Sequence, residues 1–126
     1  MTYKPYIGTE AQFQMAVASY LDSLGVLWMH PANERKTTPQ AGARLKRAGV
    51  KPGVPDVLIF ECGQDTTTTG YTSTIKGLAI ELKVGKNKTS PEQRSWLERL
   101  ENRGWQTLVS WSLDEVISVV ENYLKR

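Results

Sequence analysis

The chain has 126 residues, with 16 lysines and arginines against 13 aspartates and glutamates, and it fits one domain, residues 1–126, with a real hydrophobic core. The net charge of +3 favours a polyanionic partner over a membrane surface or an acidic small molecule. The single cysteine excludes an internal disulfide, and no apolar run resembles a membrane span or a signal peptide, so we expect a cytoplasmic protein without membrane association.

The first predicted element is an amphipathic helix. Thr9 and Gln12 have the spacing of a capping box, and Gly25 ends the helical pattern. Between these positions, apolar side chains recur at helical spacing at Phe13, Ala16, Val17, Tyr20, Leu21 and Leu24. The short apolar run 26–30 follows directly and predicts the first strand.

The middle of the chain alternates between loops and apolar runs. Residues 31–55 are rich in Gly, Pro, Thr and basic residues without a sustained period, which predicts a long loop of the kind that often carries function. Residues 56–60 form a continuous apolar run typical of a buried strand. Residues 62–77 are polar and threonine-rich and predict a connection, and residues 78–84 predict the next strand.

The last part of the chain predicts helix, strand and helix. Ser90, Pro91 and Gln93 supply an N-cap, a first-turn proline and a capping-box glutamine, residues 105–111 predict a strand, and Ser112 begins the final helix. The order is α-β-β-β-α-β-α, in which the helix between the last two strands permits a crossover connection. We therefore expect an α/β fold with a small mixed four-stranded sheet flanked by helices.

The predicted strand 78–84 contains two charged residues. Side chains alternate along a strand, so Glu81 and Lys83 share one face while the apolar Leu78, Ile80 and Leu82 share the other. An ordinary surface ion pair on a solvated sheet face is one interpretation. A functional site is the other.

Asp56 stands at the start of a buried strand, directly after a proline. Aspartate is common in turns, and alone the residue needs no other explanation. If its strand neighbours the strand of Glu81, however, the two carboxylates converge and repel each other unless a cation lies between them. Such oxygen ligands suit Mg²⁺ or Mn²⁺.

Three further residues have both a structural and a functional interpretation. Glu10 shares a helix face with apolar residues, which turns it toward the sheet, but the helix dipole also favours a glutamate there. A capping box alone explains Gln93. His30, the only histidine, is either a structural residue or a phosphate contact.

The segment 35–51 contains six lysines or arginines and no acidic residue. It is either a solvated charged run or, together with two lysines after Glu81, a frame of cations around the carboxylates that suits a phosphodiester backbone. The candidate DNA-binding residues are Arg35, Lys36, Arg44, Lys46, Arg47, Lys51, Lys86 and Lys88.

These motifs resemble a known family. "GVPD", then "IELK" with its glutamate 25 residues after the aspartate, and then "KTSPEQRSWLERLENRGW" are similar to the VRR-NUC (virus-type replication-repair nuclease) branch of the PD-(D/E)XK nuclease superfamily. The similarity extends from Glu10 to the last helix and includes "HPANER" and the basic loop. It implies a restriction-endonuclease-like core and metal-dependent cleavage of DNA.

The resemblance also implies roles for individual residues. Asp56, Glu81 and the backbone carbonyl of Leu82 would bind Mg²⁺ or Mn²⁺, with Glu10 completing the site directly or through water. Lys83 would position and help to activate the attacking water, and Gln93 would orient water or substrate.

Stand-alone relatives of this length resemble small nucleases that act as homodimers on branched DNA such as Holliday junctions. The sequence therefore predicts a structure-specific DNA endonuclease, with interface candidates in residues 107–112 and 61–76. The alternatives are a nickase or a flap or single-strand nuclease, and a non-catalytic DNA-binding accessory protein.

Overall fold

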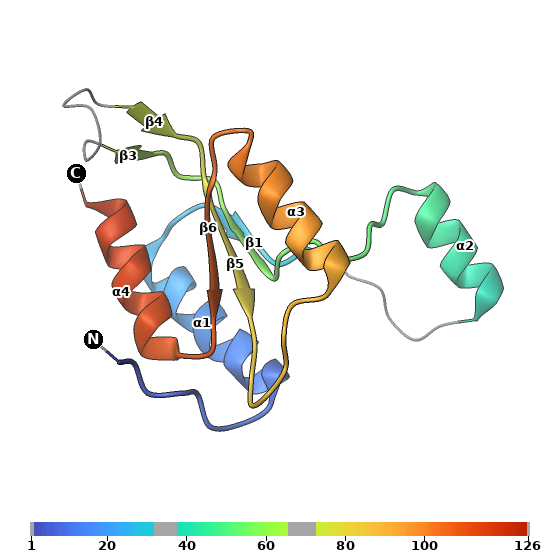
Figure 1. Ribbon diagram of the computed structural model, residues 1–126, viewed down its shortest axis with the longest axis horizontal. Coiled ribbons are helices and arrows are strands. Elements are labelled where there is room, and N and C mark those ends of the chain that lie inside the picture. The colour runs from blue at the N-terminus through green and yellow to red at the C-terminus, as the bar shows by residue number, and fades with distance from the viewer. Residues whose placement is uncertain (1, 32–37, 66–72, 126) are drawn as a thin grey trace.

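The computed structural model describes residues 2–31, 38–65 and 73–125 (Figure 1). In this part of the chain, four strands form the main sheet in the order β1-β2-β5-β6, and two further strands, β3 and β4, form a separate hairpin. The elements are α1 (Glu10–Leu24), β1 (Trp28–Met29), α2 (Pro39–Arg47), β2 (Val57–Ile59), β3 (Gly63–Asp65), β4 (Ser73–Ile75), β5 (Leu78–Leu82), α3 (Pro91–Glu101), β6 (Gln106–Ser110) and α4 (Leu113–Leu124).

The main sheet is mixed, as predicted. β5 pairs antiparallel with β2 and parallel with β6, and α3 forms the connection that the parallel pair requires. Helices α1 and α4 cover one face, where Phe13 and Val17 of α1 pack with Ile80 of β5 and Val120 of α4. The α3 helix covers the other face, which carries Glu81. The predicted α/β fold with helices on both faces of a four-stranded sheet is confirmed.

The predicted helix starts are also confirmed in the main. Thr9 and Ser90 begin α1 and α3 with complete capping boxes, and Gly25 ends α1 in the left-handed conformation. At α4, the Ser112 side chain accepts from the Glu115 N–H as expected. The Glu115 carboxylate instead accepts from the Ser110 hydroxyl, so the reciprocal half of that cap is not formed.

The structure corrects the prediction that residues 31–55 form a loop throughout, because α2 lies within this segment. Thr38 caps α2 and Pro39 occupies its first turn. No residue of α2 is buried, and the helix projects away from the sheet beyond α3 (Figure 1). Because α2 buries no residue, it has no core-facing apolar run of the kind that indicated the other helices.

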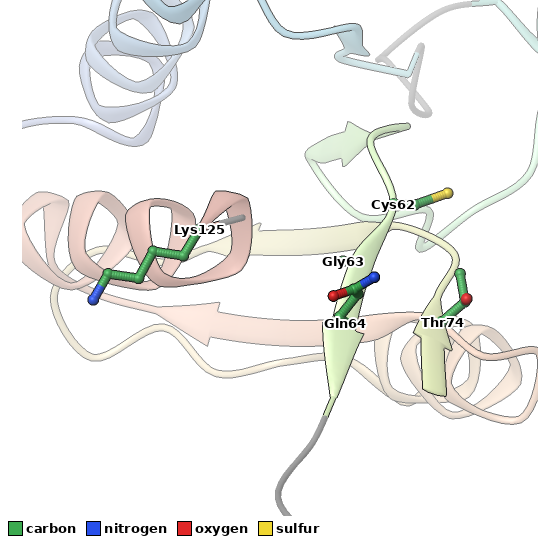
Figure 2. A pocket seen from close by; sticks show the side chains of 5 residues that line it. All are labelled: Cys62, Gly63, Gln64, Thr74 and Lys125. Carbon is green, nitrogen blue, oxygen red and sulfur yellow. The ribbon is translucent and has the colours of Figure 1, made fainter. Parts of the chain in front are cut away.

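The polar connection 62–77 also contains structure, the hairpin of β3 and β4, whose strands pair from Gly63 with Ile75 to Asp65 with Ser73. Tyr123 of α4 packs beneath this hairpin and donates a hydrogen bond of 2.6 Å to the Glu61 carbonyl. Figure 2 shows the adjoining pocket of about 310 Å³ between the end of α4 and the hairpin, with the exposed thiol of Cys62 at its rim.

None of the described helices is long and apolar enough to cross a membrane.

Candidate active site

The centre of the candidate site is the pairing of β2 with β5. Val57 lies opposite Ile80, and one further step in the same antiparallel register places Asp56 opposite Glu81, with both side chains on the α3 face. The Leu82 N–H donates a 2.8 Å hydrogen bond to Oδ2 of Asp56. The strand pairing thus brings together two carboxylates that lie 25 positions apart in the chain.

Glu10 joins this pair from the first turn of α1. One carboxylate oxygen from each of Glu10, Asp56 and Glu81 lies within 4.8 Å of the other two. The capping box at Thr9 fixes where α1 begins, so the local helix signal also sets the position of the third carboxylate.

A hydrogen-bonded network holds the Glu81 side chain. Lys83 Nζ lies 3.5 Å from Oε2 of Glu81, and Gln93 Nε2 donates to the same oxygen at 3.0 Å. Gln93 Oε1 accepts from Lys83 Nζ at 2.8 Å and from the Ser90 backbone N–H at 2.8 Å. Gln93 therefore caps α3 and contacts the charged pair at the same time, so its two sequence interpretations are not alternatives.

Burial changes the acid–base properties of the site. Glu81 is 2% exposed, and desolvation followed by repulsion from Asp56 raises its pKa to about 8, although Lys83 opposes the shift. Desolvation, then Asp56, also raises the pKa of Glu10. With Lys83 as the neighbouring cation, the Glu81 and Glu10 carboxyl groups therefore still ionise less readily than exposed ones.

One carboxylate oxygen of Glu81 fits a role as a metal ligand. Oε1 of Glu81 is buried and has no hydrogen-bond partner within the part of the chain that the structure describes, an arrangement that costs free energy in a folded protein. A divalent cation among the three carboxylates would both use this oxygen and offset the repulsion. Carboxylate oxygens at this spacing fit a hard cation and are poor ligands for a soft one.

Comparison with known families agrees with this geometry. The VRR-NUC domain model matches residues 9–111. The chain belongs to the VRR-NUC family. A solved structure described as a VRR_NUC domain protein superposes with a TM-score of 0.68 at 26% sequence identity, covering 96% of this chain and 90% of that one. A search among curated proteins gave no match.

The VRR-NUC match contains all five predicted catalytic residues, and the structure brings their side chains into one cluster: Glu10, Asp56, Glu81, Lys83 and Gln93. Leu82, predicted to offer its carbonyl, lies between two of them and fixes Asp56 through its N–H. The cluster, whose three carboxylates could hold a metal ion, therefore lies within the nuclease-type VRR-NUC domain.

The predicted DNA-binding residues of this VRR-NUC chain lie in three places. Arg44, Lys46 and Arg47 are exposed on α2, and Lys51 is exposed between α2 and β2. The turn between β5 and α3 carries the exposed Lys86 and Lys88. Arg35 and Lys36 lie outside the described residues.

Two further residues position the VRR-NUC site: His30, for which the sequence left a structural role or a phosphate contact open, and Gly53 of "GVPD", to which it gave no role. His30 Nδ1 donates to the Asp56 carbonyl at 2.6 Å, which ties β1 to the start of β2. Gly53 has a φ of +82°, and a Cβ atom there would lie 2.5 Å from the backbone carbon of Glu92. The "KPGVPD" segment therefore needs glycine both for its backbone conformation and for close contact with α3. The Pro-Gly pair was the available signal.

Proposed function

We propose that this protein is a metal-dependent, structure-specific DNA endonuclease that hydrolyses phosphodiester bonds in branched DNA, with Holliday junctions as the preferred substrate, and acts as a homodimer. The observation that carries this proposal is the meeting of three carboxylates directly beside Lys83 and Gln93, with a buried oxygen of Glu81 that has no hydrogen-bond partner among the described residues.

The residues that would hold Mg²⁺ or Mn²⁺ are Asp56, Glu81 and Glu10, together with the carbonyl of Leu82. When bound, such an ion lowers the pKa of a coordinated water and offsets negative charge on the phosphate. A purely DNA-binding protein gains nothing from carboxylates gathered beside phosphates, because they repel the backbone.

Lys83 and Gln93 supply the remaining chemistry. The Lys83 ammonium lies next to Glu81 and can hold a water for attack and stabilise the charge that develops on the phosphate. Gln93 directs that ammonium through a 2.8 Å hydrogen bond and offers an amide to water or substrate. Both groups are fixed before substrate binds, which is the condition for effective electrostatic stabilisation.

Cations around the site would hold the DNA backbone. Lys86 and Lys88 follow β5 directly, Lys51 precedes the Asp56 segment, and Arg44, Lys46 and Arg47 extend along α2. Their exposure fits contacts with phosphates, which bind mainly through charge and carry no sequence information.

A homodimer would match the two-fold symmetry of a four-way junction and allow paired cuts. Among the described residues, β6 lies at one edge of the main sheet, and Trp111 directly after it is 36% exposed. This edge, which overlaps the predicted range 107–112, is our candidate interface.

A cleavage assay tests the proposal. Labelled four-way junction, flap, splayed and linear duplex DNA are offered to the wild type and to Glu81→Ala with Mg²⁺, Mn²⁺, Ca²⁺ or EDTA. We expect symmetric junction cuts that require Mg²⁺ or Mn²⁺ and are lost in the variant. Preferred cutting of flaps or single strands would replace the junction assignment with another nuclease selectivity. Binding of every substrate without cutting would instead identify a DNA-binding accessory protein.

A further inference from the structure

A second concave surface lies between α3 and the segment that precedes β2. It has a volume of about 460 Å³, within the usual range for ligand pockets. Its lining residues are Lys51, Pro52, Pro91, Glu92, Ser95, Trp96 and Arg99, and we call it the α3 groove. None of these residues belongs to the carboxylate, lysine and glutamine cluster.

The α3 groove combines an aromatic ring with positive charge. The Arg99 guanidinium carbon lies 4.7 Å from the centre of the half-buried Trp96 ring, in a cation–π contact. Lys51 stands on the other wall. An aromatic ring beside cations is the combination by which proteins bind unpaired nucleotides, since bases stack on the ring while phosphates meet the charges.

The groove is joined to the candidate active site on two sides. Glu92 lines the groove, and the next residue, Gln93, contacts Glu81. Pro52 lines the opposite wall, and Gly53 after it lies against the backbone of α3 on the way to Asp56. A DNA strand with a phosphate at the carboxylates would therefore have its neighbouring nucleotides beside the groove.

From these observations we propose that the α3 groove binds an unpaired nucleotide next to the scissile phosphate, with its base against Trp96 and Arg99 and its phosphate on Lys51. This inference rests on the proposed nuclease function and adds a basis for choosing branched DNA. A paired base in a duplex stacks on its neighbours and is not free to enter, whereas bases at a branch point can leave the stack. Glu92, which also lines the groove, offers an acceptor to a base amino group.

The test measures binding separately from cleavage. Fluorescence anisotropy with Ca²⁺ in place of Mg²⁺ compares a short labelled oligothymidine with a blunt duplex, and a gel confirms that the DNA stays intact. We expect Trp96→Ala to weaken oligothymidine binding by about fivefold to a hundredfold, the range found for the loss of one stacking contact, with duplex affinity little changed. Trp96→Phe should retain most of the affinity.

Arg99→Ala should also weaken oligothymidine binding, and Arg103→Ala serves as its matched control, because Arg103 is an exposed arginine of the same region that does not line the groove. A 2-aminopurine base beside the branch point should be quenched by the wild type and by Trp96→Phe, and much less by Trp96→Ala. If Trp96→Ala does not fold, as judged by circular dichroism, the test rests on Trp96→Phe and on the comparison of Arg99→Ala with Arg103→Ala.

The outcomes separate this inference from the proposed function. If Trp96→Ala and Arg99→Ala bind oligothymidine as the wild type does and the protein still cuts DNA, nucleotide binding by the α3 groove is wrong and the proposed nuclease function stands. If oligothymidine binding depends on Trp96 but no DNA is cut with any of the metals, the proposed nuclease function is wrong and nucleotide binding by the α3 groove stands. A wild type that binds no DNA at all would overturn both.

Discussion

The carboxylate site and the α2 helix both carry charged side chains, but the charges are largely buried at the site and exposed on α2. At the site, four elements meet to hold Glu81 at 2% exposure, with each neighbour at a fixed distance. On α2, Arg44, Lys46 and Arg47 project from a helix that buries no residue. Charge that is positioned by packing can select one chemical step, whereas charge that is only exposed can attract a polyanion and little more. Substitutions at the site should therefore mainly lower the rate of cleavage, and substitutions on α2 should mainly weaken DNA binding.

The largest expected effect comes from the site. Asp56→Ala and Lys83→Ala should each lower the single-turnover rate of junction cleavage by about a thousandfold or more, because each removes a group that must act on one phosphate. The far-UV circular dichroism and the affinity for DNA should change little. Glu98→Ala, which removes an exposed carboxylate of α3 outside the cluster, is the control. Undiminished cleavage in either folded site variant would contradict the assignment.

A smaller loss is expected for Gln93→Ala, which keeps all the charged residues but releases Lys83 and Glu81 from the shared amide. Cleavage should fall by about tenfold to a hundredfold. The lost cap should cost about 1 kcal/mol of unfolding free energy. Gln12→Ala removes the equivalent cap from α1, where Gln12 bonds Thr9, so it should cost similar stability with little loss of cleavage. Equal cleavage losses in the two variants would reduce Gln93 to a structural role.

The raised pKa of Glu81 predicts how stability depends on pH in EDTA. An acid with a folded-state pKa of about 8 and an ordinary value of 4.5 keeps its proton in the folded state, so its stabilising effect is complete below about pH 4.5 and is lost as the pH rises toward 8. Glu81→Gln has no such loss. The variant should gain on the order of 1–3 kcal/mol relative to the wild type between pH 5 and pH 8.5, measured by urea unfolding. A constant difference across this range would show that Glu81 titrates normally.

The smallest effect belongs to α2. The double substitution Arg44→Ala with Arg47→Ala should weaken DNA binding by about fivefold to twentyfold at moderate salt and reduce the dependence of affinity on salt, since fewer counterions are released. The melting temperature should not move, because α2 buries nothing. Lys125→Ala, at the far end of the chain beside the pocket of Figure 2, is the control. A salt dependence equal to that of the wild type would remove α2 from the DNA interface.

The same contrast explains what the sequence could predict. The elements around the core carry dense local signals, such as the capping boxes at Thr9 and Ser90 and the apolar spacing of α1, and these were predicted correctly. The α2 helix has end signals, Thr38 and Pro39 at its start and the left-handed Gly49 after its C-cap, but no residue between them is buried. The β3–β4 hairpin is short and lies outside the main sheet, so strand periodicity did not reveal it.

For the site, the residue types were visible in the sequence but their joint geometry was not. That Asp56 faces Glu81 depends on the register of β2 with β5, which no local pattern fixes. The hydrogen bond from Leu82 to Asp56 and the contact of Gly53 with α3 join segments far apart in the chain, so they emerge only from tertiary packing.

The cap of α3 also explains a choice between two similar residues. The position three residues after a helix N-cap accepts glutamate as readily as glutamine, because only an acceptor oxygen is needed there. Here the other end of the side chain donates to Glu81 at 3.0 Å, and a second carboxylate would instead oppose it. Glutamine can accept from the Ser90 N–H and also donate to Glu81, whereas glutamate can only accept. The site therefore requires glutamine at position 93, although the helix cap alone would tolerate either residue.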